Sequence, residues 1–311
     1  MKEIKKIAIA GSGIMGVGMA QCFAQKGYDV LVYDINQELL DKCIDSIKFN
    51  QKTLIEYSII SEECAVESLD RISLTTNLGD FADADFVIEA IIENLEIKQD
   101  FWKKVEEICD GEAIFATNTS GLSINDVCAK LDNKSRFAGT NWWNPPHIIP
   151  LVEVTMGDDT SEETVQSICD TLKEIGKEPV VIRKEINGFI GNRIQFAVFR
   201  EALNIAAQGI ASYEDIDRAV KYGIGFRYPT LGPFETADLG GLDTFYYISK
   251  NLFKDLSSSE IPPEILEEIF NEKKYGIKTG EGFFKYESEE QINTILKERD
   301  EKFLKTLKAL A

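Results

Sequence analysis

The chain has 311 residues, of which 44% are hydrophobic and 28% are charged, and its formal net charge at pH 7 is −19. This length allows two domains with separate cores, and the composition is that of an ordinary globular enzyme. The acidic balance argues against partners such as nucleic acid or an anionic membrane surface. No apolar run approaches the length of a membrane-spanning helix, and charged residues rather than a signal peptide follow Met1.

The six cysteines show no C-x-x-C spacing, and several fall on the apolar side of predicted helices. They are Cys22, Cys43, Cys64, Cys109, Cys128 and Cys169. Thiols in such positions behave as small hydrophobic residues. We expect them to be reduced and buried, as in a cytoplasmic protein, and we expect no metal site.

The first predicted elements form a nucleotide-binding unit. A strand at residues 4–10 leads into Gly11-Ser12-Gly13-Ile14-Met15-Gly16, a helical pattern follows at residues 17–26, and a second strand covers residues 29–33. Gly11 permits a tight turn, Gly13 lets the backbone approach a pyrophosphate, and Gly16 lets helix and strand pack closely. The N–H groups at the start of the helix, those of Ile14 and Met15 among them, favour phosphate binding.

Asp34 ends the second strand, where a carboxylate can accept hydrogen bonds from an adenosine ribose. The same carboxylate would repel a 2′-phosphate, so the sequence predicts NAD rather than NADP as the cofactor. A strand, turn and helix whose glycines serve packing alone is the alternative interpretation.

Alternating helices and strands continue the N-terminal half. Helical sequence covers residues 37–52 and runs on to about 68, with a further helix at residues 95–109, and strands are predicted at residues 72–75, 85–89 and 114–118. This alternation predicts an α/β fold with a Rossmann-type, doubly wound, mainly parallel sheet. Polar residues follow successive strands at positions 90–94, 117–120 and 140–144, where ligands of such sheets bind.

The C-terminal half is predicted to be all-α. A last strand at residues 180–182 precedes Asn187-Gly188, which places the domain boundary between residues 186 and 187. Helical patterns follow at residues 189–210, 264–271 and 289–310, and Ser212 is an expected N-cap of another helix. We therefore expect a cofactor domain at 1–186 and a helical substrate-binding and dimerisation domain at 187–311.

Several longer motifs together make the chain resemble the L-3-hydroxyacyl-CoA dehydrogenase family, which includes 3-hydroxybutyryl-CoA dehydrogenases. They are Glu89-Ala-Ile-Ile-Glu93-Asn94, Asn118-Thr-Ser120, Asn144-Pro145 with Glu153, Gly188-Phe-Ile-Gly-Asn192-Arg193, the segment 232–243 and Lys278-Thr-Gly-Glu-Gly-Phe-Phe284. The resemblance covers nearly the whole chain. It implies an NAD-dependent oxidoreductase of fatty acid metabolism that forms a homodimer through its C-terminal domain.

The resemblance also implies roles for single residues. Glu93, Lys98 and Asn118 fall where family members touch the cofactor. Ser120 falls where a hydroxyl binds the substrate oxygen, with Asn144 nearby and Asn192 assisting from the second domain. Family members that use coenzyme A carry several lysines on the helix after the second strand, where they meet the phosphates of that cofactor. Of these lysines, this chain has Lys48 and Lys52.

The family's catalytic histidine belongs twelve residues before Glu153, and here that position holds Asn141. A histidine takes the hydroxyl proton while hydride leaves for the nicotinamide, and a carboxylate fixes its tautomer. An amide side chain cannot accept a proton at neutral pH. Asn141 is either a substitution introduced into an active parent, a natural loss or change of the chemistry, or a sign that another group serves as base. If another group serves as base, His147, the single histidine of the sequence, is the candidate.

The substrate stays open between two classes. The predominantly apolar and slightly acidic stretch at residues 54–60 weakens the expectation of coenzyme A. The Asn144-Pro145-Pro146-His147 segment resembles the branch of the superfamily that contains lambda-crystallin, a gulonate dehydrogenase. Arg227 and Tyr228 are candidates to bind a small carboxylate. We expect a 3-hydroxyacyl-CoA first, a free 3-hydroxy acid of the sugar acid or carnitine type second, and an NAD-binding protein without turnover as the third alternative.

Overall fold

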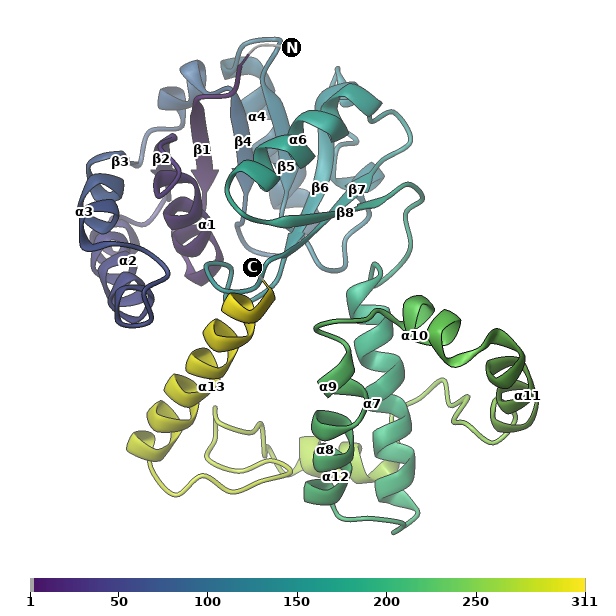
Figure 1. Ribbon diagram of the computed structural model, residues 1–311. Coiled ribbons are helices and arrows are strands. Elements are labelled where there is room, and N and C mark those ends of the chain that lie inside the picture. The colour runs from purple at the N-terminus through teal and green to yellow at the C-terminus, as the bar shows by residue number, and fades with distance from the viewer. Residues whose placement is uncertain (1–2, 311) are drawn as a thin grey trace. The chain divides into compact units, whose positions relative to one another are not determined.

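The computed structural model describes residues 3–310 and divides into two compact units, Met1–Ile190 and Gly191–Ala311. The division follows shortly after the boundary that the sequence predicts between residues 186 and 187. Each unit has its own helices and loops (Figure 1), and each is described by itself.

One eight-stranded sheet with the order β3-β2-β1-β4-β5-β6-β7-β8 forms the centre of the N-terminal unit. The strands are β1 (Lys6–Ala10), β2 (Asp29–Tyr33), β3 (Ile72–Thr75), β4 (Phe86–Glu89), β5 (Ile114–Thr117), β6 (Phe137–Trp142), β7 (Leu151–Met156) and β8 (Glu178–Ile182). Neighbours are parallel except that β7 runs antiparallel to β6. The expected mainly parallel, Rossmann-type sheet is confirmed.

Helices cover both faces of this sheet. The helical elements of the unit are α1 (Ile14–Ala24), α2 (Gln37–Glu56), α3 (Glu62–Asp70), η1 (Leu78–Asp83), α4 (Leu95–Ile108), α5 (Ile124–Val127), η2 (Lys134–Arg136) and α6 (Glu162–Glu174). One apolar core contains residues of α1, α2 and α6, and the other contains residues of η1, α4 and α5. Alternate residues of β1 enter the two cores, since Ile7 packs into the first and Ala8 into the second. A strand that is buried on both faces must be apolar almost throughout, as β1 is.

Backbone conformation explains where the predicted helix ends differ from the observed ones. The helical stretch predicted to run to about residue 68 is interrupted between α2 and α3, where Ser58 has a φ of +51°. The helix predicted from residue 189 begins two residues later as α7 (Gly191–Ala207), because Phe189 has a φ of +51° and cannot join a right-handed helix. Helix α1 starts earlier than predicted, directly after Gly13.

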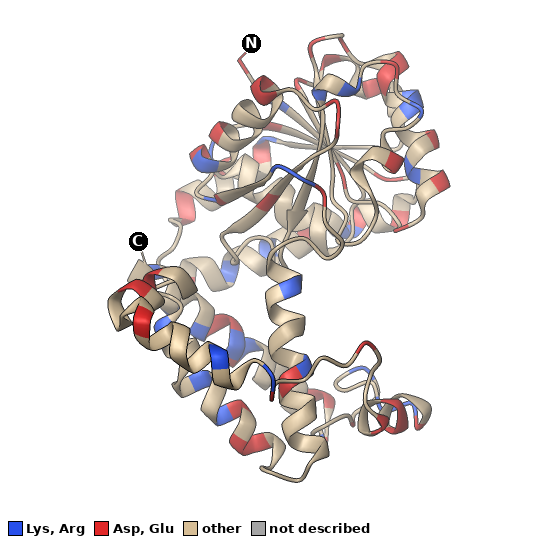
Figure 2. Cartoon of the chain, turned by 90° about the vertical axis from the view of Figure 1, so that its right-hand side faces the viewer, with Lys and Arg blue, Asp and Glu red and all other residues tan. Residues whose placement is uncertain are grey.

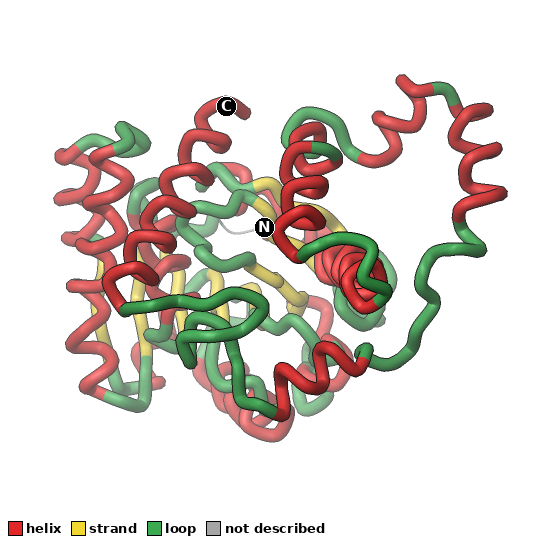
Figure 3. The backbone as a smooth tube through the Cα atoms, turned by 90° about the horizontal axis from the view of Figure 1, so that it is seen from below, coloured by secondary structure: helices red, strands yellow, loops and turns green. Residues whose placement is uncertain are grey.

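The C-terminal unit has helices as its regular elements, as predicted. They are α7 (Gly191–Ala207), α8 (Tyr213–Tyr222), α9 (Ile224–Arg227), α10 (Pro233–Gly240), α11 (Leu242–Leu252), α12 (Glu264–Asn271) and α13 (Glu289–Leu310). Ser212 caps α8, as expected, since its side chain accepts a hydrogen bond of 3.2 Å from the amide of Asp215. An extended loop joins α11 to α12 (Figure 3).

Charged residues lie mainly on helices and loops, while the strands of the sheet carry few of them (Figure 2). Between residues 3 and 310, no helix combines the length and the apolar character that a membrane crossing requires. All six cysteines are free thiols. The expectation that they are buried is wrong for Cys64 and Cys109, which are partly exposed at the edges of their helices.

Candidate active site

The loop from Gly11 to Gly16 is packed so tightly against neighbouring backbone that a side chain would not fit at two of its glycines. Gly11 has a φ of +102°, and a Cβ there would lie 2.4 Å from the carbonyl oxygen of Ala90. A Cβ on Gly16 would lie 1.8 Å from the carbonyl oxygen of Gly11. By contrast, a Cβ on Gly13 would meet no protein atom within 4 Å. The space at Gly13 is therefore free for a ligand, as the approach of a pyrophosphate requires.

The N-terminus of α1 is suited to the same ligand. Gly13 is its N-cap and offers no side-chain acceptor, and the first turn contains no acidic residue. The first amide groups of the helix, including those of Ile14 and Met15, therefore have no side-chain acceptor at the cap, and the helix dipole adds partial positive charge. These features fit the phosphates of NAD.

Asp34 follows β2 and is held beside the glycine loop. One carboxylate oxygen accepts hydrogen bonds from both the amide and the hydroxyl of Ser12, each at 2.8 Å, and the other accepts the amide of Asn36 at 3.0 Å. Ser12, within the glycine loop, was not singled out by sequence analysis, because the motif leaves its position unspecified. Its two bonds hold the Asp34 carboxylate against the Gly11–Gly16 turn.

A buried ion pair lies at the end of β4. Lys98 and Glu89 are both fully buried and form a short contact between ammonium and carboxylate. Lys98 Nζ also lies 3.3 Å from Glu93, whose side chain is 44% exposed, and 3.4 Å from the carbonyl oxygen of Asn118. Burial raises the pKa of Glu89, and the ammonium of Lys98 opposes that rise. Sequence analysis assigned no role to Glu89, although an acid at the end of a buried strand indicates that a buried partner exists.

The residues after β5 stand next to this pair. Asn118 accepts a hydrogen bond of 3.0 Å from the amide of Trp142 through its side chain, which links the ends of β5 and β6. Thr119 is buried and donates its hydroxyl proton to Glu93. Ser120 is exposed, so its hydroxyl is accessible to a ligand at this edge of the sheet.

Asn141 and Glu153 are opposite each other on β6 and β7, and both are buried. The side-chain amide of Asn141 donates to Glu153 Oε2 at 2.8 Å, and the indole N–H of Trp143 donates to the same oxygen at 3.2 Å. Glu153 Oε1 accepts the amide of Ile190 at 2.8 Å. Both carboxylate oxygens of Glu153 are thus engaged by donors, and the donor from β6 is an amide. The contribution of Trp143 has no signal in the sequence.

The loop between β6 and β7 is anchored to α1. A Cβ on Gly18 would lie 2.4 Å from the ring of Pro146, so helix and loop are in direct contact. The buried ammonium of Lys177 donates to the carbonyl oxygens of Pro146 and Ile149 at 2.5 and 2.9 Å. Asn144, in this loop, is exposed, and His147 is partly buried.

The remaining predicted residues are carried by other elements. Lys48 and Lys52 are exposed one helical turn apart on α2. Asn192 is in the first turn of α7, in the C-terminal unit. Arg227 and Tyr228 are exposed at the end of α9. The geometry of the N-terminal unit therefore brings together the cofactor loop, Glu93, Ser120, Asn141 and Glu153 along one edge of the sheet.

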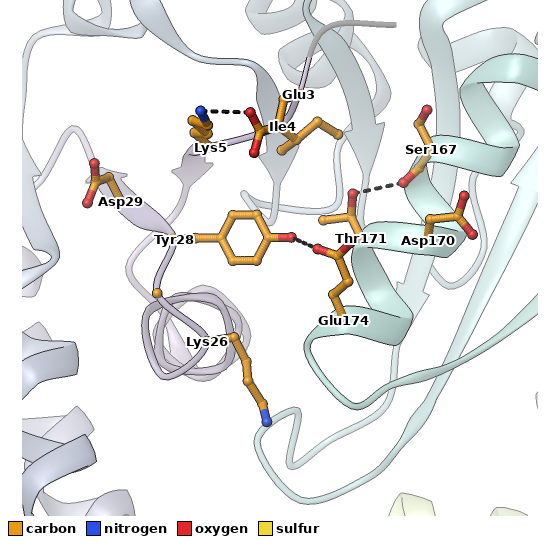
Figure 4. Close-up of a pocket in the computed structure, with 11 residues that line it drawn as sticks. Glu3, Ile4, Lys5, Lys26, Tyr28, Asp29, Ser167, Asp170, Thr171 and Glu174 are labelled. Atoms are coloured by element: carbon orange, nitrogen blue, oxygen red, sulfur yellow. Dashed lines mark hydrogen bonds and ion pairs between the residues drawn. The ribbon is translucent and has the colours of Figure 1, made fainter.

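A hollow of about 660 Å³ opens at the opposite edge, beside the starts of β1 and β2 (Figure 4). Its walls include Lys5, Tyr28 and Glu174, and the Tyr28 hydroxyl donates to Glu174. Burial and the neighbouring carboxylate raise the pKa of Tyr28. This bond ties the residue before β2 to the end of α6, and no residue of the glycine loop lines the hollow.

Comparison with known proteins assigns both halves of the chain. Residues 6–186 match the family model described as 3-hydroxyacyl-CoA dehydrogenase, NAD binding domain. Residues 188–286 match the model described as 3-hydroxyacyl-CoA dehydrogenase, C-terminal domain.

Individual relatives agree with this assignment. A 5-formyl-3-hydroxy-2-methylpyridine 4-carboxylate 5-dehydrogenase from Mesorhizobium japonicum is 35% identical over 97% of this chain and 96% of its own. A probable 3-hydroxybutyryl-CoA dehydrogenase from Deinococcus radiodurans is 38% identical over 90% of this chain and 100% of its own.

Solved structures extend the likeness to three dimensions. The structure of a 5-formyl-3-hydroxy-2-methylpyridine 4-carboxylic acid 5-dehydrogenase, an NAD⁺-dependent dismutase, matches with a TM-score of 0.91, 34% identity and 99% of both chains covered. The (S)-3-hydroxybutyryl-CoA dehydrogenase from Ralstonia eutropha matches with a TM-score of 0.76 and 31% identity, over 92% of this chain and 100% of its own. The chain therefore belongs to the 3-hydroxyacyl-CoA dehydrogenase family and is an NAD-dependent oxidoreductase of that type.

Proposed function

We propose that this protein binds NAD at the Gly11–Gly16 loop together with a 3-hydroxyacyl-CoA such as 3-hydroxybutyryl-CoA. Its interconversion of the 3-hydroxy and 3-oxo compounds is slow, because no proton acceptor stands where the family has its histidine. The observation that carries this proposal is the 2.8 Å hydrogen bond from Asn141 Nδ2 to Glu153 Oε2. It reproduces the pairing of an imidazole with a carboxylate but without a basic nitrogen.

Each residue of the site has a role that follows from its donors and acceptors. Since Asn141 gives its N–H to Glu153, its oxygen is left to accept a hydrogen bond from the substrate hydroxyl. Ser120 binds the same substrate oxygen, with Asn144 beside it and Asn192 contributed by the C-terminal domain. Lys48 and Lys52 meet the phosphates of coenzyme A. NAD held at the Gly11–Gly16 loop would supply the acceptor for the hydride of the carbinol carbon.

Restoring the histidine tests this proposal directly. Asn141→His is expected to raise NADH formation from 3-hydroxybutyryl-CoA by about 10²- to 10⁴-fold, the usual contribution of a general base. Asn141→Ala, the matched control, is expected to stay as slow as the unaltered protein. Equal and fast rates for the unaltered protein and Asn141→His would contradict the proposal and assign the base to another group. His147→Gln would then show whether His147 is that base.

A free acid is the second candidate substrate, and two observations favour it. The full-length match with the highest TM-score reported above, 0.91, is to an enzyme named for a pyridine carboxylic acid. Helix α2 carries four acidic residues among its lysines, which is unfavourable for a polyanionic coenzyme A chain. Turnover by Asn141→His on free hydroxy acids or aldehyde acids, with none on coenzyme A esters, would establish this alternative. NADH binding without turnover on either class would establish the non-catalytic one.

The same proposal assigns residues 1–186 to the cofactor and residues 187–311 to substrate binding and dimerisation. Exposed apolar side chains on α10 and α11 support a homodimer, since Phe234, Leu239 and Leu242 are 86%, 75% and 61% exposed. The six free thiols fit a reducing compartment and therefore a cytoplasmic location.

A further inference from the structure

Thr119 lies between the two parts of the proposed site and has no assigned role in it. It is the second residue after β5, between Asn118 and Ser120, and its exposed fraction is 2%. A threonine that is almost fully buried at the mouth of a ligand site must satisfy its hydroxyl within the protein.

The hydroxyl of Thr119 uses its full bonding capacity. It donates to a carboxylate oxygen of Glu93 and accepts the amides of Gly121 and Leu122 at 3.3 and 3.0 Å. A hydroxyl has one donor and two acceptor sites, so none is left over. The turn that presents Ser120 is therefore fastened to a side chain from the loop after β4.

Glu93 is itself held from the other side. Its second carboxylate oxygen lies 3.3 Å from the ammonium of Lys98, and Lys98 is paired with Glu89. The ammonium donates hydrogen bonds to Glu89 and to the carbonyl oxygen of Asn118, and it forms an ion pair with Glu93. Because these partners fix its position, Lys98 serves to orient Glu93, whose side chain is the partly exposed member of the network.

We infer that Thr119 is a positioning residue that makes the cofactor carboxylate Glu93 and the Ser120 turn one mechanical unit. The inference rests on the proposed function, in which Glu93 meets NAD and Ser120 meets the substrate. A ligand that orders Glu93 then orders the Ser120 turn as well, through a single side chain. Coupling between two sites requires a physical connection that both sites influence. Here the connection is the Thr119 hydroxyl, which joins Glu93 to the turn after Ser120.

Hydrogen exchange at the amides of Gly121 and Leu122 tests the link in the protein without ligand. Thr119→Val and Glu93→Ala are both expected to speed this exchange by roughly threefold to tenfold, the factor that corresponds to one lost hydrogen bond. Thr119→Ser keeps the hydroxyl, and Glu93→Gln keeps an acceptor for it, so both are expected to exchange as the unaltered protein does. A purely local role of Thr119 predicts no change in Glu93→Ala, and that result would overturn the inference.

The second part of the experiment repeats the exchange measurement after NADH is added. NADH is expected to slow exchange at Gly121 and Leu122 in the unaltered protein and in Thr119→Ser, but not in Thr119→Val, although fluorescence titration still detects NADH binding to that variant. Slowing in Thr119→Val equal to that in the unaltered protein would overturn the inference. Absence of NADH binding in every variant would count against the proposed function alone, because the ligand-free comparison of Glu93→Ala with Glu93→Gln still decides the link.

Discussion

Asp34 is the residue that we expect to distinguish NAD from NADP. Its carboxylate is fixed beside the glycine loop by the amide and hydroxyl of Ser12 and by the amide of Asn36. A negative charge that is held at this place would meet the ribose of NAD favourably and the 2′-phosphate of NADP unfavourably. We therefore expect selectivity to depend on the charge of Asp34, whose position is set by its hydrogen bonds.

Substituting Asp34 separates these two effects. Asp34→Asn keeps an acceptor oxygen but removes the charge, and it is expected to improve the affinity for NADPH relative to NADH by roughly tenfold or more, which is about 1.4 kcal/mol. Asp34→Ala removes the acceptor as well and is expected to weaken NADH binding further. Titration of each protein with both cofactors measures the ratio. An unchanged ratio in Asp34→Asn would mean that shape rather than charge excludes the phosphate.

At the scale of elements, the ends of β4 and β5 are joined to the first turns of α4 by charge. Glu89 ends β4, Lys98 lies in the second turn of α4, and both side chains are fully buried. Thr117, the last residue of β5, donates to Glu89 at 2.7 Å, and the amide of Ile91 donates to it at 3.0 Å. A buried carboxylate with these donors is tolerable only while the ammonium is present.

Removing the ammonium should therefore be costly in a pH-dependent way. Lys98→Met leaves Glu89 charged, buried and unpaired, and is expected to lower the free energy of unfolding at neutral pH by about 3–5 kcal/mol. Burial already raises the pKa of Glu89, and the loss of Lys98 raises it further. When the pKa of Glu89 is higher in the folded than in the unfolded protein, Glu89 takes up a proton more readily in the folded protein as the pH falls. The loss of unfolding free energy caused by Lys98→Met should therefore become smaller at lower pH.

Denaturant unfolding at several pH values measures this dependence. Lys98→Met combined with Glu89→Gln serves as the control, since it has no charge left to neutralise, and its loss of stability is expected to vary less with pH. A loss in Lys98→Met that stays constant from pH 8 to about pH 5 would contradict the assignment of Glu89 as the stranded charge.

For the whole molecule, the composition of the C-terminal unit points to a partner. Among the described residues of that unit, Leu203 and Leu304 are the buried ones, while large apolar side chains of α10, α11 and the loops around them are exposed. Exposed examples are Phe234, Leu239, Leu242, Tyr246, Tyr247 and Phe253. Exposed apolar side chains of this kind are covered in stable homodimers, whose interfaces resemble a divided core.

A charge placed in this surface should separate the subunits. The unaltered protein is expected to be a dimer by light scattering after size-exclusion chromatography, and Leu239→Glu is expected to shift it towards monomer and lower its melting temperature. The melting temperature of the unaltered protein should also rise with protein concentration, because association stabilises the folded chain. Lys297→Glu, on the exposed side of α13, is the control for added charge. A monomeric unaltered protein would contradict this prediction.

The sequence predicts the sheet, the helical C-terminal unit and the glycine loop, because these depend on local spacing and apolar periodicity. Helix boundaries such as those at Ser58 and Phe189 depend on positive φ values. Serine and phenylalanine rarely adopt such values, so the sequence does not predict these boundaries. Partners such as Ser12 for Asp34 and Trp143 for Glu153 depend on which side chains meet across the fold, and no spacing in the chain specifies that. Glu89 is intermediate, since its place at the end of a buried strand indicates a partner but does not name Lys98.

The contact of Gly18 with Pro146 has a consequence for the history of the family. A methyl group at position 18 would lie 2.4 Å from the proline ring, so the helix that begins the cofactor site leaves no room for independent change in the loop that carries Asn144. Lineages that gained an alanine at position 18 should also have exchanged the proline at position 146 for a smaller residue. Aligned sequences of relatives should show the two columns co-varying, which would record that helix α1 constrains the loop that carries Asn144.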